Sequence, residues 1–160
     1  MKIMLFLLVI GFSFCAGMAF QGSKTKPGAS DRAHVTGIGG IFFKSEDPTK
    51  LKQWYAKHLG ITVRAGAQEG EPPMFLWRER DNPDVEGLTV WGVFPKTTKY
   101  FEPTKAPFMI NYRVDNLDRL LSQLRQAGVQ VDSKVTDDFT GRFGWAADPE
   151  GNRFELWEPK

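Results

Sequence analysis

The chain has 160 residues, of which 21 are lysine or arginine and 19 are aspartate or glutamate. This near-balance of charge gives no electrostatic reason to expect a nucleic acid as partner. The single cysteine, Cys15, lies near the start of the chain, so the remainder can form no disulfide, thiolate metal site or cysteine nucleophile.

The first residues are typical of a secretory leader. Lys2 precedes an apolar run from Ile3 to Phe14, and small residues up to Ala19 suit a signal peptidase. We expect cleavage after Ala19, which makes residues 1–19 a signal peptide and the protein an exported one, periplasmic or extracellular. After cleavage no stable membrane insertion is expected. An uncleaved anchor is the alternative, because the apolar run is close to the length that spans a membrane.

Residues 20–34 predict a flexible linker, since they are rich in Gly, Ser and Lys and show no apolar period. The folded domain is expected over residues 35–159, an ordinary length for one domain.

Two helices are expected, over residues 47–60 and 115–128. Each begins at an Asp or Asn that can accept hydrogen bonds from free backbone N–H groups, and each ends at a glycine. Apolar stripes at helical spacing support both. They consist of Leu51, Trp54, Tyr55, His58 and Leu59 in the first helix, and of Leu117, Leu120, Leu121 and Leu124 in the second.

Aromatic and β-branched content predicts six strands, over residues 37–44, 75–79, 88–94, 108–114, 142–146 and 153–158. Alternation assigns Ile41, Phe43, Ile110, Tyr112, Val114, Phe154 and Leu156 to the face that the helices cover. The opposite face is expected to hold Gly40, Phe42, Trp77, Thr89, Trp91, Val93, Met109, Asn111, Arg113, Trp145, Arg153, Glu155 and Trp157. Large aromatic side chains with a few hydrogen-bonding groups are typical of a pocket for a small molecule. A solvated sheet face is the alternative.

The chain also contains an internal repeat. Residues 38–60 resemble residues 106–128, and residues 86–95 align with residues 150–159, with Glu-Gly at one end and Pro at the other. Two copies of a strand-helix-strands unit bury a common core and leave a cleft between them. Residues 96–107, which include Tyr100, are expected to connect the two copies as a loop.

The paired units resemble the vicinal oxygen chelate superfamily, which includes glyoxalase I, extradiol dioxygenases, methylmalonyl-CoA epimerase, and the fosfomycin- and bleomycin-resistance proteins. The stretch from Asp148 to Leu156 (DPEGNRFEL) is similar to the family's DP-D/E-G-N-x-x-E-L signature. The resemblance implies an α+β fold with two βαβββ modules in tandem, over residues 35–95 and 106–159. The modules would form a cupped mixed sheet with the helices on its convex face.

In metal-dependent members of that superfamily, each module gives one metal ligand from its first strand and one from its last. The resemblance carries these positions onto Gly40, Trp91, Met109 and Glu155. Glu155 alone suits a divalent ion, because glycine has no side chain, tryptophan only donates and methionine is a soft ligand. We therefore expect no metal and no other cofactor, with an unusual metal as the alternative.

Glu155 is the candidate catalytic residue. A carboxylate in an aromatic cup would act as a base toward a proton next to a carbonyl, or as an anchor for a cationic ligand. A structural carboxylate paired with an arginine is the alternative. The expected ligand-binding residues are Trp77, Trp91, Met109, Asn111, Arg113, Arg142 and Trp145.

Two functions remain open at this point. One is a binding module that holds a small aromatic or flat molecule without chemistry, which the missing metal ligands favour. The other is a lyase or isomerase of the glyoxalase type with Glu155 as its general base. In either case the partner is a small molecule, and the cup closes within one chain or between the two chains of a homodimer.

Overall fold

The computed structural model describes residues 32–80 and 82–160. The expected signal peptide over residues 1–19 and most of the expected linker over 20–34 lie outside this part. Within it the elements follow in the order β1 (Val35–Ser45), α1 (Pro48–Leu59), β2 (Met74–Arg78), β3 (Glu86–Pro95), β4 (Phe108–Val114), α2 (Leu117–Gln126), β5 (Val131–Asp138), β6 (Gly141–Ala147) and β7 (Arg153–Pro159).

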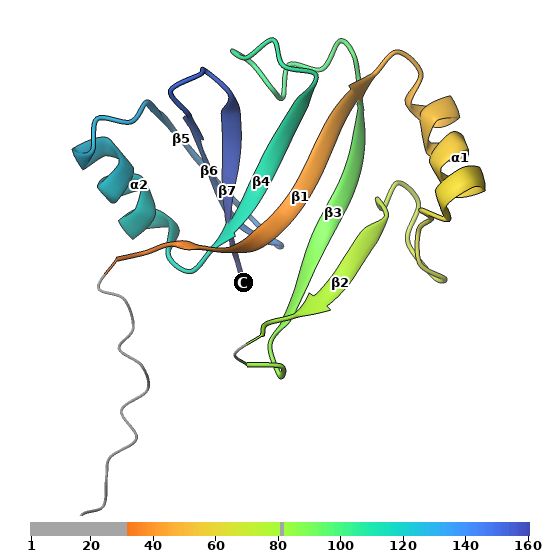
Figure 1. Ribbon diagram of the computed structural model, residues 1–160, viewed down its shortest axis with the longest axis horizontal. Helices are drawn as coiled ribbons and strands as arrows, with labels where there is room; N and C mark the ends of the chain where they lie inside the picture. Colours follow the sequence, from red (N-terminus) through yellow and green to blue (C-terminus); the bar gives the residue numbers. More distant parts are fainter. Residues whose placement is uncertain (1–31, 81) are drawn as a thin grey trace, which may run out of the picture.

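The strands of the described chain form one mixed sheet in the order β2-β3-β1-β4-β7-β6-β5. β1 and β4 pair antiparallel at its centre, while β1 with β3 and β4 with β7 pair parallel. The sheet is curved, and α1 and α2 lie at its two outer ends (Figure 1). The expected two-module α+β fold is confirmed. No helix of the described residues is long and apolar enough to cross a membrane.

The two modules differ in one strand. The second has β4, α2 and three further strands, whereas residues 61–73 connect α1 to β2 without a strand. β5, over Val131–Asp138, was not among the predicted strands. Its sequence, VDSKVTDD, is mainly polar because every residue of this edge strand is half-buried or exposed. A strand that buries little apolar surface leaves little signal in its composition.

Both helices begin and end as their sequences predict. The Asp47 side chain accepts from the N–H of Lys50 at 3.0 Å, and Asn116 accepts from that of Arg119 at 2.9 Å. Asn116, rather than Asp115, is therefore the N-cap of α2. After the helices, Gly60 has a φ of 68° and Gly128 a φ of 77°, a left-handed conformation that favours glycine.

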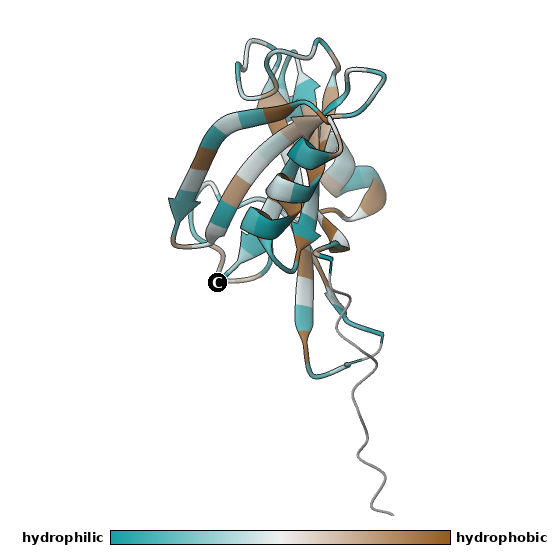
Figure 2. Ribbon diagram, turned by 90° about the vertical axis from the view of Figure 1, so that its left-hand side faces the viewer, coloured by the Kyte–Doolittle hydropathy of each residue, from teal (hydrophilic) through white to brown (hydrophobic). Residues whose placement is uncertain are grey.

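The helices cover the convex face unequally. Leu117 and Leu121 of α2 are buried with Val114 and Leu156, whereas α1 has no buried residue. The outward side of α2 is mainly hydrophilic in Figure 2. α2 is thus held by a leucine core, and α1 depends on fewer contacts.

β3 faces the opposite way from the prediction. Trp91 is 5 % exposed and lies beneath α1, with its ring 4.6 Å from that of Tyr55 and 6.0 Å from that of Phe43. Leu88 and Val90 lie on the concave side instead. The assignment of Thr89, Trp91 and Val93 to the concave side is therefore wrong.

The reason is that the Glu-Gly pair has a different structural role in each copy of the repeat. Glu86-Gly87 starts the strand β3, while Glu150-Gly151 lies in the turn before β7, where Gly151 has a φ of 81°. Aligning the copies on Glu-Gly shifted the register by one residue. In a strand, a shift of one residue exchanges the two faces.

Candidate functional site

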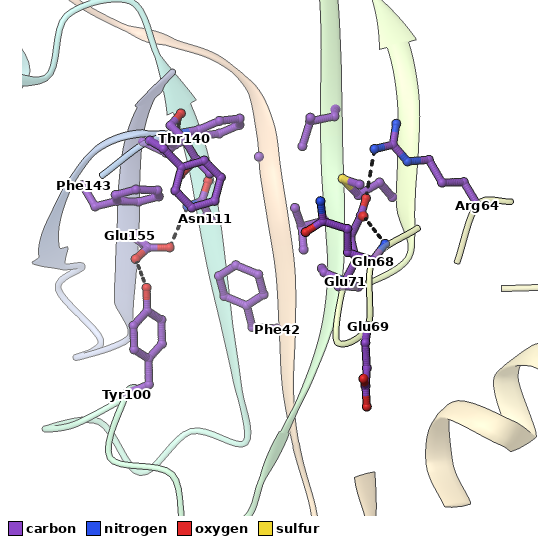
Figure 3. A pocket seen from close by; sticks show the side chains of 17 residues that line it. Phe42, Arg64, Gln68, Glu69, Glu71, Tyr100, Asn111, Thr140, Phe143 and Glu155 are labelled. Carbon is purple, nitrogen blue, oxygen red and sulfur yellow. Dashed lines mark hydrogen bonds and ion pairs between the residues drawn. The ribbon is translucent and has the colours of Figure 1, made fainter. Parts of the chain in front are cut away.

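The concave side of the sheet holds a cavity of about 620 Å³, which we call the cup. Its walls come from both modules, from the segment over residues 61–73, and from Tyr100 between the modules (Figure 3). They include Phe42, Arg64, Glu69, Glu71, Met74, Leu88, Val90, Tyr100, Asn111, Phe143, Glu155 and Trp157. This volume fits a small organic molecule.

Glu155 is the buried carboxyl group of the cup. It is 1 % exposed, and the parallel pairing of β4 with β7 places it beside Asn111. The Nδ2 of Asn111 donates to Oε2 at 2.6 Å, and the hydroxyl of Tyr100 donates to Oε1. Figure 3 shows these two donors approaching the carboxyl group from different sides. Together they fix its orientation.

Burial and hydrogen bonding act against each other on this carboxyl. Desolvation raises the pKa of Glu155, while the hydrogen bonds from Tyr100 and Asn111 and the charge of Arg153 lower it, and the net shift is upward. The N–H of Trp145 also acts to lower this pKa, although it makes no hydrogen bond of good geometry. Burial first, and then the nearby Glu155, raise the pKa of Tyr100, so its phenol keeps its proton at physiological pH.

Tyr100 is one of several cup residues that the sequence did not predict for the site, since it was expected in a connecting loop; Phe143 of β6 is another. Although 40 % of the residue is exposed, its ring stacks on Phe94 at 5.5 Å with an interplanar angle of 6°. The neighbouring Phe101 is fully buried, and Nη1 of Arg153 donates to the carbonyl oxygen of Tyr100 at 2.8 Å. The segment is therefore anchored, and a Tyr-Phe pair in a linker was its only sequence signal.

Two rings next to Glu155 lie nearly parallel to each other. Phe143 of β6 and Trp157 of β7 are directly paired across the strands, with centroids 6.3 Å apart and planes only 10° from parallel. The Nε1 of Trp157 donates to the carbonyl of Thr140 at 3.2 Å, which satisfies its polar group. We call Phe143 and Trp157 the ring platform.

Only two of the residues predicted for the site line the cup, namely Asn111 and Glu155. Met109 is fully buried and packs with Phe42, Phe101 and Trp145 in a core cluster beneath. Trp145 is 4 % exposed and lines a different cavity. Met109 and Trp145 therefore lie on the predicted face of the sheet but outside the cup.

Trp77 and Arg113 lie outside the cup, which corrects the prediction for both. The ring of Trp77 covers the backbone of Gly37 and Gly87, where a Cβ would collide with it, and its Nε1 donates to Thr89 at 3.1 Å. Nη1 of Arg113 donates to Glu79 at 2.7 Å.

Arg142 is also misplaced by the prediction. It forms two hydrogen bonds with Asp118 of α2, at 2.7 and 2.8 Å, and this interaction lowers the pKa of the Asp118 carboxyl. Gly144, two residues further along β6, faces Leu121 of the same helix. Because alternate residues share a face, Arg142 points to the convex side.

The donor set of the cup does not fit a divalent metal ion. The strand register pairs Gly40 with Val90 and Asn111 with Glu155, and Val90 rather than Trp91 lines the cup. Two of these four positions carry no donor atom. In the described residues, no three His, Cys, Asp or Glu side chains are grouped to hold a metal.

Comparison with known proteins agrees with this architecture. A family model for the Glyoxalase/Bleomycin resistance protein/Dioxygenase superfamily matches residues 33–156. A methylmalonyl-CoA epimerase variant from Streptomyces coelicolor, in complex with 2-nitronate-propionyl-CoA, has a TM-score of 0.56 at 17% identity, covering 79% of this chain and 99% of that one. A hypothetical protein from Bacillus halodurans has a TM-score of 0.52 at 9% identity, covering 80% and 95%. No curated protein matches the chain.

Proposed function

The chain belongs to the Glyoxalase/Bleomycin resistance protein/Dioxygenase superfamily, and from this premise we propose that its cup binds a small, flat organic molecule without a divalent metal. The ring platform is the observation that carries this proposal. Phe143 and Trp157 present nearly parallel rings at the cavity wall. Stacking on such rings adds about 0.5–1.5 kcal/mol beyond the burial of apolar area.

The polar groups of the cup would orient the ligand on the platform. The Glu155 carboxyl, held by Tyr100 and Asn111, is the hydrogen-bonding group beside the rings. On the wall formed by residues 61–73, Arg64 pairs with Glu71 at 3.2 Å. The buried Glu155 and Asn111 beside the rings favour a ligand that carries a polar edge next to its flat apolar face.

The test is binding of naphthol compared with decahydronaphthol, its saturated and non-planar analogue. We expect naphthol to shift the indole N–H resonance of Trp157 and to bind more tightly than the analogue. Phe143→Ala should weaken naphthol binding by about three- to tenfold, the loss of one ring contact. Phe75→Ala is the matched control, since Phe75 lies on β2 outside the cup and should leave the affinity unchanged.

Equal affinity for the flat and the saturated compound would contradict the proposal. Elemental analysis of protein purified without chelators tests the metal separately. A stoichiometric transition metal that is lost in Glu155→Gln would overturn the metal-free part and show that Glu155 is a ligand.

A lyase or isomerase reaction with Glu155 as general base is the second candidate. The raised pKa of the Glu155 carboxyl favours it, because a general base works best when its pKa lies near the operating pH. On this view Glu155→Gln abolishes turnover while naphthol still binds. Turnover that survives the substitution would exclude Glu155 as the base.

We also propose that the protein is exported after cleavage behind Ala19. The apolar run and the small residues before that position support this. Mass spectrometry of protein from a periplasmic or culture fraction should give an N-terminus at Phe20. An intact Met1 in the membrane fraction would instead indicate an anchor.

A further inference from the structure

We propose that the protein has a second ligand site, for a small organic anion, in a cavity that adjoins the cup at Tyr100. This cavity of about 450 Å³ shares Tyr100 and Phe143 with the cup but lies over β5, β6 and β7 and the segment of residues 96–107. We call it the Lys99 cavity and define it by Lys99, Glu102, Lys134, Asp138, Trp145 and Arg153. The proposal goes beyond the binding of a flat molecule in the cup and does not depend on it.

Two cationic side chains lie over one indole ring in the Lys99 cavity, and a third lines the cavity. The guanidinium of Arg153 lies 5.1 Å from the Trp145 ring centroid, and Nζ of Lys134 lies 5.9 Å from it. Lys99 lines the same wall. Neither lysine forms an ion pair with any described residue. Like charges held close together repel each other, and an anion between them removes this cost.

Arg153 has a donor left for such an anion. Its Nη1 donates to the carbonyl of Tyr100 at 2.8 Å, and its Nη2 donates to Asp132 at 2.5 Å. Its Nε is buried and has no hydrogen-bond partner. A buried donor without a partner is costly, so an acceptor brought by a ligand would be stabilised there. The contacts with Tyr100 and Asp132 hold the guanidinium in place beforehand.

None of the acidic side chains described in the structure forms an ion pair with Lys99 or Lys134. Asp138 accepts at Oδ1 from both the N–H and the hydroxyl of Thr140, at 2.7 and 2.6 Å. Glu102 has no ion-pair partner among the described residues and is the acid that would repel an anion. With Asp132, which pairs with Arg153, three acids match the three cations, so the site relies on the two unpaired lysines beside the aromatic floor of Trp145 rather than on a net charge. This combination suits a carboxylate or phosphate attached to a small aromatic group.

The charges predict opposite effects for two neighbouring side chains. Lys134→Gln removes an attractive charge and should weaken binding of benzoate about fivefold. Glu102→Gln removes a repulsive charge and should strengthen it by a similar factor. Lys52→Gln on the exposed surface of α1 is the matched control and should change nothing. Raising the salt concentration should weaken benzoate binding to the unmodified protein.

The experiment is a titration of the full chain with benzoate, with phenyl phosphate, and with benzamide as the neutral analogue, followed by NMR. The indole N–H resonances are assigned by single Trp→Phe substitutions. We expect both anions, but not benzamide, to shift the Trp145 resonance. The stronger of the two anions identifies the headgroup that the site prefers.

Three results would overturn the proposal: equal binding of benzoate and benzamide, no effect of Lys134→Gln and Glu102→Gln, or a benzoate shift confined to Trp157. The naphthol titration reads the cup through Trp157, so it can succeed where this one fails. A negative benzoate titration would therefore not contradict the proposed binding of a flat molecule in the cup. A negative naphthol titration would likewise not contradict the anion site.

Discussion

Glu155 is a carboxyl group whose burial opposes its ionisation. Desolvation raises its pKa above the ordinary value of 4.5. The hydrogen bonds donated by Tyr100 and Asn111 lower this pKa by less than desolvation raises it. The native state therefore holds a proton on Glu155 at pH values where the unfolded chain has already lost it. Because the native state binds this proton more tightly than the unfolded chain, it adds to the free energy of unfolding at low pH. This contribution is lost as the pH rises through the raised pKa.

The prediction at this scale is a stability difference that depends on pH. As the pH rises from about 4.5 through the raised pKa, the unmodified protein should lose stability relative to Glu155→Gln, by at most about 1.4 kcal/mol per pH unit. Glutamine keeps the volume and cannot ionise. Urea unfolding of both proteins across this range measures the difference.

Tyr100→Phe provides the control for this effect. It removes a hydrogen bond that lowers the pKa of Glu155, so the window of lost stability should extend to higher pH. The exposed Asp118 and Asp138 and the half-buried Asp148 have lowered pKa values and act at lower pH in all three proteins. If the unmodified protein and Glu155→Gln show parallel pH profiles, burial does not govern this carboxyl.

Among the elements, α1 depends on a single buried aromatic residue. Trp91 of β3 contacts Tyr55, whereas Trp54 and Leu59 of the same helix are 52 % and 60 % exposed. α2 instead buries two leucines. The apolar stripe of α1 was predicted correctly as a helix signal, but three of its five residues, Trp54, His58 and Leu59, are exposed.

The prediction for this element is that the backbone amides of α1 lose protection from hydrogen exchange while those of α2 keep it. Trp91→Ala removes a ring that is 95 % buried and should destabilise the fold by about 3–5 kcal/mol. In the milder Trp91→Phe, amide hydrogen exchange in α1 should accelerate while exchange in α2 stays near the unmodified rate. Leu121→Val is the counterpart in α2 and should reverse the pattern. Equal acceleration in both helices would show that α1 does not rely on Trp91.

In the whole molecule, the two modules share one sheet. β1 and β4 pair along their length at its centre, so neither module can lose its central strand without exposing the other. The core cluster beneath the cup also combines Phe42 of the first module with Met109 and Trp145 of the second. Such a shared core predicts one cooperative transition.

The test of cooperativity uses one substitution in each module. Trp91→Phe and Leu121→Val should each move the whole unfolding curve, and tryptophan fluorescence and far-UV circular dichroism should give coincident midpoints in each variant. A module that unfolds separately would show two transitions, with only one of them shifted by each substitution.

The sequence by itself determined both helices with their caps, most of the strands, and the face on which Asn111 and Glu155 lie, because these follow from local periodicity and capping chemistry. It did not determine that β5 completes the sheet, since a polar edge strand carries little compositional signal. The tertiary structure alone decided which face of β3 lines the cup, because a shift of one residue in register exchanges the two faces of a strand without any change in its sequence. It also decided that Tyr100 reaches Glu155, a contact across 55 positions that no local rule encodes.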